Sequence, residues 1–212
     1  MSLFKSFRVM AGTIKQYVIL FATAVGVTAA LGIVRMLAPK EIVVGFIDGF
    51  VPFFATISVT VSCMIGSMGV FNANNPLAVG YKYYHSLPNA YELFRKALIF
   101  SDIFAIALLV LYSAVVVALF GWMQVFFALG AGAFCIGLLN FFGHGRSPFA
   151  KMMPFVVAGG FAGGFATGIS EENGFELTPL FIKIILPVAA VICVSGIAFA
   201  VLRAKKAWER EG

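Results

Sequence analysis

The sequence predicts an all-α integral membrane protein with six transmembrane helices and both termini in the cytoplasm. Hydrophobic residues make up 61% of the chain and charged residues only 11%, with a mean hydropathy of +1.00, whereas roughly 25% of residues are charged in a soluble domain. Several apolar runs reach the about 20 residues that a spanning helix needs. The short alternating segments of a β-barrel are missing. We therefore treat residues 1–212 as a single transmembrane domain.

The first segment, residues 1–16, is basic and amphipathic. Its three cations, Lys5, Arg8 and Lys15, stand among large apolar side chains. Such a segment is expected to lie in the membrane interface before the first span. The apolar runs behind it predict spans at about residues 17–38, 42–71, 98–120, 122–142, 153–169 and 178–202.

The Lys and Arg residues predict the topology. In this six-span arrangement most of them fall on the side of the two termini, which the positive-inside rule assigns to the cytoplasm. The remaining three and the acidic loop with Glu171, Glu172 and Glu176 fall on the opposite side. We read the net charge of +6 as a sign of topology and not of a nucleic-acid partner. The cations on the terminal side are Lys5, Arg8, Lys15, Lys82, Arg95, Lys96, Arg146, Lys151, Arg203, Lys205, Lys206 and Arg210.

The longest polar interruption, residues 86–98, lies between the second and third expected spans. Pro88 can occupy the first turn of a helix, and Asn89 with Glu92 three residues later is a variant of the capping box. Apolar residues then recur at helical spacing, with polar residues on the other face. This pattern predicts a short amphipathic helix that either lies on the membrane surface or docks on a partner.

This stretch, SLPNAYELFRKAL, resembles the Leu-Pro, Glu and Lys pattern between the second and third helices of ABC transporter permeases of the ABC-2 exporter type. Asn89-Ala90 stands in place of the usual Ser-Arg, and Arg95 in place of the familiar Gly before the lysine. The resemblance implies that a surface helix here couples the chain to an ATPase. The coupling residues would be Leu87, Pro88, Asn89, Tyr91, Glu92, Leu93, Phe94, Arg95 and Lys96.

The resemblance also implies the partners of the chain. They would be a separate ATP-binding subunit, which holds ATP and Mg, and a second permease copy or homologue. The chain itself shows no Walker A motif, no GxSxG motif and no HExxH motif, so we do not expect it to be an enzyme or to bind a metal. The expected location is the plasma membrane, most simply a bacterial inner membrane.

Two further patterns are candidates for a translocation path, with helix packing as the simpler interpretation of both. One is an aromatic stripe on the second expected span, and the other is a glycine cluster in the fifth, whose four-residue spacing lets helix backbones approach closely in lipid. A phenylalanine-rich path would favour a hydrophobic or amphipathic cargo such as a peptide, lipid or drug. The residues are Phe46, Phe50, Phe53, Phe54, Gly159, Gly160, Gly163 and Gly164.

Asp48, Asp102 and Lys183 fall inside or at the ends of expected spans, where charges are costly. Each is near enough to an interface for a structural role, and no chain of charges crosses the membrane centre. Cys63, Cys135 and Cys193 show no paired spacing and are read as buried thiols.

Three other functions stay open at this level. The first is a six-span substrate-capture subunit, similar to those of energy-coupling-factor vitamin importers, which also depend on a separate ATPase. The second is an intramembrane enzyme. The third is a regulatory or immunity-type membrane protein.

Overall fold

The computed structural model describes residues 2–11, 15–37, 70, 81–120, 122–142 and 179–209. Every described residue other than Ser2 and Leu87–Asn89 is helical, which confirms the all-α prediction for this part of the chain. The helices are α1 (Leu3–Ala11), α2 (Lys15–Leu37), α5 (Tyr81–Ser86), α6 (Ala90–Phe120), α7 (Trp122–Phe142) and α9 (Pro179–Glu209).

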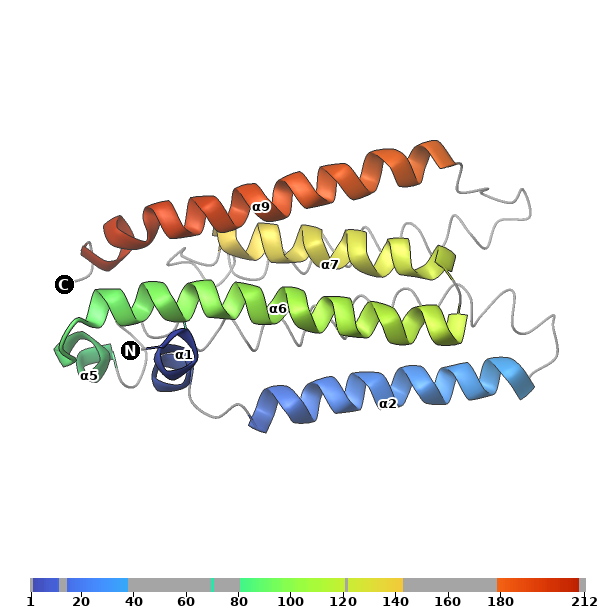
Figure 1. Ribbon diagram of the computed structural model, residues 1–212, viewed down its shortest axis with the longest axis horizontal. Helices are drawn as coiled ribbons and strands as arrows, with labels where there is room; N and C mark the ends of the chain where they lie inside the picture. Colours follow the sequence, from blue (N-terminus) through green and yellow to red (C-terminus); the bar gives the residue numbers. More distant parts are fainter. Residues whose placement is uncertain are drawn as a thin grey trace.

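Four long helices, α2, α6, α7 and α9, lie along the long axis of the molecule (Figure 1). α2 and α6 run in one direction, and α7 and α9 run in the other. α1 and α5 lie at the end of the bundle where both termini are found. α6 is central, because it packs against each of the other described helices.

The expected separate helix at residues 86–98 does not form. Its residues from Ala90 onward are instead the first turns of α6, which continues without a break to Phe120. The physical reason is that no Gly or Pro interrupts residues 90–120, so nothing in this stretch ends a helix. α9 likewise continues past the expected end at Leu202 to Glu209. The expected spans at 42–71 and 153–169 lie outside the described residues, apart from Val70.

A hydroxyl pair joins α2 to α6 inside the bundle. Thr28 donates its hydroxyl proton to the carbonyl oxygen of Ala24 at 2.8 Å, and its oxygen lies 2.5 Å from that of Tyr112. Because the proton of Thr28 is already used, Tyr112 acts as the donor to Thr28. Both buried hydroxyls are thereby satisfied, as burial requires. The apolar residues of this bundle core are Ala24, Ala105, Leu109, Tyr112, Val116, Ile136 and Cys193.

The backbones of α7 and α9 touch at Gly137 and Gly196. A Cβ atom on Gly137 would lie 2.5 Å from the carbonyl oxygen of Ile192, and one on Gly196 would collide with the backbone of Gly137. Backbone atoms cannot relieve such a clash by changing rotamer, as a side chain can, so the two helices would have to move apart. Small residues at such crossings are typical of helix packing in lipid.

Two described helices contain stretches long and apolar enough to cross a membrane, Ala90–Leu119 and Leu186–Lys206. Shorter apolar stretches occur at Phe21–Leu37 and Gly132–Phe142. Apolar side chains are also exposed on the outward faces of α2, α6 and α9. Large exposed side chains on them include Val18, Ile33, Met36, Leu37, Val110, Leu111, Ile184, Val188, Val191, Val194 and Leu202.

We predict that Gly137→Ala lowers the stability of the protein by about 1–3 kcal/mol, the usual cost of overpacking. The matched control is Gly26→Ala on α2, where nothing lies within 4 Å of the added Cβ. That variant gains up to about 1 kcal/mol from helix propensity. Thermal unfolding of the two variants in detergent measures the difference. Equal unfolding temperatures would contradict the close crossing of α7 and α9.

Candidate functional site at the start of α6

A tight turn, Leu87–Ala90, connects α5 to α6. The amide of Ala90 donates to the carbonyl oxygen of Leu87 at 3.1 Å, and Asn89 has a positive φ of 58°. Pro at the second position and a left-handed Asn at the third are the features of a type II turn. The sequence predicted a helix start at Pro88 and Asn89, and the structure places both residues in the turn that precedes the helix.

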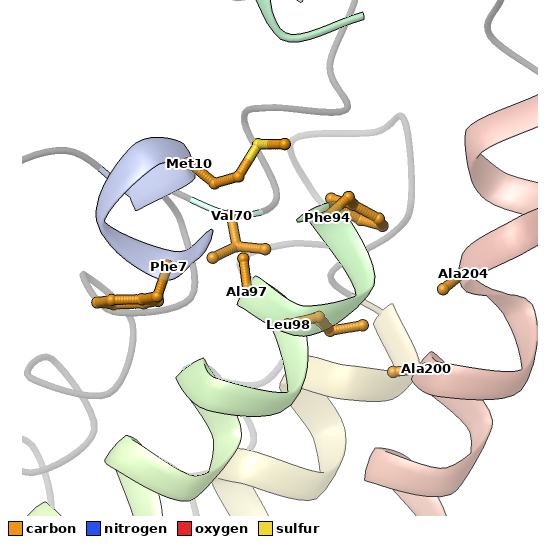
Figure 2. Close-up of a cluster of buried hydrophobic side chains, with 8 residues drawn as sticks. All are labelled: Phe7, Met10, Val70, Phe94, Ala97, Leu98, Ala200 and Ala204. Carbon is orange, nitrogen blue, oxygen red and sulfur yellow. The ribbon is translucent and has the colours of Figure 1, made fainter. Parts of the chain in front are cut away.

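The first turns of α6 are anchored by a buried apolar cluster, the junction cluster (Figure 2). Phe94, Ala97 and Leu98 of α6 fill its centre. α1 contributes one side and the C-terminal part of α9 another, so three helices far apart in sequence meet here. The complete cluster is Phe7, Met10, Val70, Phe94, Ala97, Leu98, Ala200 and Ala204.

Phenylalanine rings extend the contact between α1 and α6. The Phe7 ring lies 5.0 Å from that of Phe100 and 6.2 Å from that of Phe104, and Phe4 meets Phe100 edge-on at 5.7 Å. These are favourable geometries for aromatic pairs. α1 is therefore fixed to α6 by its apolar face, while Lys5 and Arg8 remain exposed.

A column of rings ties α5 to the end of α9. The imidazole of His85 is stacked on the indole of Trp208, with 3.8 Å between ring centroids and 5° between the planes. Tyr81 lies 4.2 Å from His85 on one side, and Phe94 lies 5.0 Å from Trp208 on the other. The short helix α5, which has no buried residues, is held in place by this column.

The opposite face of the junction is polar. Pro88, Asn89, Glu92 and Arg95 are exposed. Lys96 donates to Glu92 one helical turn away, at 2.5 Å. This hydrogen bond, together with the charge of Lys96, lowers the pKa of the Glu92 carboxyl. Glu92 is thus a stable anion on the surface of the junction.

The structure divides the nine predicted coupling residues into three groups. Pro88, Asn89, Glu92 and Arg95 are exposed and available to a partner. Phe94 is fully buried and holds the junction together. The partly exposed remainder are Leu87, Tyr91, Leu93 and Lys96. The predicted path residues at 46–54 and 159–164 lie outside the described residues.

Sequence reasoning missed Trp208 and did not connect it with His85. One signal was available, because Trp208 is a large aromatic residue in an otherwise charged tail, KKAWER. The partner of such a residue cannot be identified from spacing when it lies more than one hundred positions away. Within the described ranges, no group of three or more His, Cys, Asp or Glu residues is arranged to hold a metal.

Cations gather at the end of the bundle that carries the junction. Of the described Lys and Arg residues, Arg35 ends α2 and Lys183 starts α9, both at the far end (Figure 1). The others belong to α1, α5, the starts of α2 and α6, and the end of α9. They are Lys5, Arg8, Lys15, Lys82, Arg95, Lys96, Arg203, Lys205 and Lys206.

We predict that Asn89→Val destabilises the turn by about 1–2 kcal/mol, because a branched side chain is strained at positive φ. Asn89→Gly, which adopts this conformation freely, should leave stability within about 0.5 kcal/mol of the parent. Thermal unfolding compares the two variants. A tolerated valine would argue against the left-handed conformation.

We also predict that Phe94→Ala costs about 3–5 kcal/mol, the usual loss for a fully buried phenylalanine. Its neighbour Arg95 is exposed, so Arg95→Ala should change stability by less than about 0.5 kcal/mol. Denaturation in detergent measures both. If the arginine variant is the less stable of the two, the assignment of inner and outer faces is wrong.

Comparison of the chain with protein-family models, curated proteins and solved structures found no match. The function proposed for the junction therefore rests on the sequence resemblance together with the geometry and charges of the junction.

Proposed function

We propose that this chain is the membrane-spanning permease subunit of an ATP-driven exporter of the ABC-2 type. A separate ATP-binding subunit docks on the polar face of the junction at the start of α6. Two permease copies, or one copy and a homologue, enclose the path of a hydrophobic or amphipathic cargo. ATP and Mg are bound by the partner subunit.

The outward faces of the long helices support placement in a membrane. In water, large apolar side chains such as Leu37, Val191 and Leu202 would each cost on the order of 1.5–3 kcal/mol relative to burial. In a lipid bilayer that cost disappears, because the solvent is itself apolar. The same faces on α2, α6 and α9 are then lipid contacts or contacts with a second copy.

The length of α6 supports a docking site outside the bilayer. Its 31 residues rise about 46 Å at 1.5 Å per residue, whereas the hydrocarbon core is about 30 Å thick. About ten residues therefore extend beyond the core. The polar ones, Glu92, Arg95 and Lys96, are at the start of the helix, so this end protrudes.

The collected cations support the cytoplasmic side for this end. Lys and Arg flank spans mainly on the cytoplasmic side, and here they surround the junction on α1, α5, α6 and α9. This orientation agrees with the proposed six-span topology, in which both termini lie in the cytoplasm, most simply of a bacterium with the chain in its inner membrane. An ATPase that uses cytoplasmic ATP has access to that face.

The observation that carries the proposal is the combination of an exposed polar face and a buried anchor on the same two turns. Glu92 and Arg95 face outward, while Phe94 and Leu98 are fixed between α1 and α9. A partner that moves the exposed face must move α6 with it, because no hinge separates the two. The junction is suited to transmit force directly into the bundle.

The experiment is purification of the tagged chain from its native membrane in mild detergent, followed by identification of the proteins that accompany it. We predict a stoichiometric protein with a Walker A motif. Glu92→Lys should reduce its recovery at least tenfold, about 1.4 kcal/mol, because the change places a cation where the partner meets an anion.

Glu209→Lys is the matched control. Glu209 is also an exposed glutamate with a lysine four residues away, Lys205 at 3.7 Å, at the same end of the bundle. It should retain the ATPase. Equal loss in both variants would indicate a response to overall charge and not docking at the junction. A chain that carries a tightly bound small ligand without an ATPase would favour a substrate-capture subunit instead.

A further inference from the structure

A polar pair lies buried between α6 and α7, away from the junction. Asp102 of α6 is 4% exposed and Asn140 of α7 is 2% exposed. The side-chain amide of Asn140 donates to Asp102 Oδ1 at 2.8 Å and to the carbonyl oxygen of Ile136 at 3.0 Å. Both amide hydrogens of Asn140 are therefore used.

The two remaining oxygens of this pair, Asp102 Oδ2 and Asn140 Oδ1, are buried and have no hydrogen-bond partner. Both are acceptors if the carboxyl is ionised. Two unpaired acceptors in one buried site are unfavourable, since each loses its hydrogen bonds to water without replacement. The pair lacks a donor.

Nothing with a positive charge neutralises Asp102 in the described part of the chain. The described lysines and arginines on the helices that pack against α6 form no ion pair with Asp102. On α6 itself, Lys96 is paired with Glu92 and Arg95 is exposed. The charge of Asp102 also acts on the buried thiol of Cys193 on α9. The described lysines and arginines on those helices are Lys5, Arg8, Lys15, Arg35, Lys82, Lys183, Arg203, Lys205 and Lys206.

A proton satisfies the site better than a metal ion does. Calcium takes about six to eight oxygen ligands and magnesium requires a near-octahedral set, whereas this pair offers two unpaired oxygens. One proton on Oδ2 converts an acceptor into a donor and removes the buried charge. The acceptor it needs, Asn140 Oδ1, belongs to the group already bonded to Oδ1 of the same carboxyl.

We propose that Asp102 and Asn140 form a proton-binding site between α6 and α7, in which the Oδ2–H of Asp102 donates to Asn140 Oδ1. The carboxylate takes up one proton from water and becomes a neutral acid, and no other bond forms or breaks. The two groups then share a pair of hydrogen bonds. Loss of the proton leaves an unpaired anion between α6 and α7 and weakens their packing. The site depends only on the packing of α6 against α7, so it does not require the proposed transport function.

Infrared spectroscopy of the full-length chain in detergent tests the proposal. Asp48 and Asp102 are the only aspartates in the chain, so labelling aspartate with ¹³C at the side-chain carboxyl marks just two groups. At neutral pH we expect a carboxylic-acid C=O band that shifts with the label and with D₂O. The band should persist in Asp48→Asn and vanish in Asp102→Asn. In Asn140→Leu it should move to higher frequency as the hydrogen bond is lost.

The pH dependence of unfolding is the second readout. The parent should lose thermal stability as alkaline pH removes the proton, and Asp102→Asn, which is neutral at every pH, should not show this loss. If Asp102→Asn does not fold, the test rests on Asp48→Asn, in which a carboxylic-acid band that shifts with the ¹³C label can come only from Asp102.

Absence of a labelled acid band at neutral pH, or its assignment to Asp48, would overturn the proposal. Stabilisation by NaCl relative to choline chloride without an acid band would show a metal-cation site in place of a proton site.

Discussion

The continuity of α6 is the constraint on which the other described elements depend. Residues 90–120 contain neither Gly nor Pro, so the helix passes from the polar junction into the apolar bundle without a break. α1, α2, α5, α7 and α9 all pack against it. A break in α6 would therefore separate the junction cluster from the bundle core, and each would lose the helix that connects them.

The left-handed backbone of Asn89 determines where α6 begins, and the burial of apolar side chains determines which face of α6 points inward. The left-handed Asn89 directs the chain from α5 into the helix, and Phe94 and Leu98 then turn their face toward α1 and α9. Glu92 and Arg95 are exposed as a consequence, since they stand two positions before and one position after Phe94, which at 3.6 residues per turn rotates them about 200° and 100° away from its direction. A separate surface helix could rotate independently of the span, whereas this arrangement cannot. Coupling through it would be direct.

The polar contacts Thr28–Tyr112 and Asp102–Asn140 both join described helices, and they differ in how completely their hydrogen-bonding groups are satisfied. Tyr112 and Thr28 need nothing further, because each hydroxyl has a partner and neither bears a charge. Asp102 and Asn140 leave two acceptors unpaired. In an apolar environment this difference is large, since an unpaired buried group loses its hydration without compensation. The Thr28–Tyr112 contact therefore does not change with pH in the range where proteins fold, whereas the Asp102–Asn140 contact depends on the proposed proton.

The sequence alone determined the helical character, the bounds of α7 at Trp122–Phe142 and the polar stretch at residues 86–98, because composition, periodicity and turn residues are local properties. The absence of Gly and Pro from residues 90–120, also a local property, allows the polar stretch to continue into α6. Only the tertiary structure decided that Phe94 faces inward and that His85 stacks on Trp208. The same holds for the meeting of Asp102 with Asn140. These contacts join residues 38 to more than 120 positions apart, and their formation depends on how whole helices pack, which no local pattern specifies.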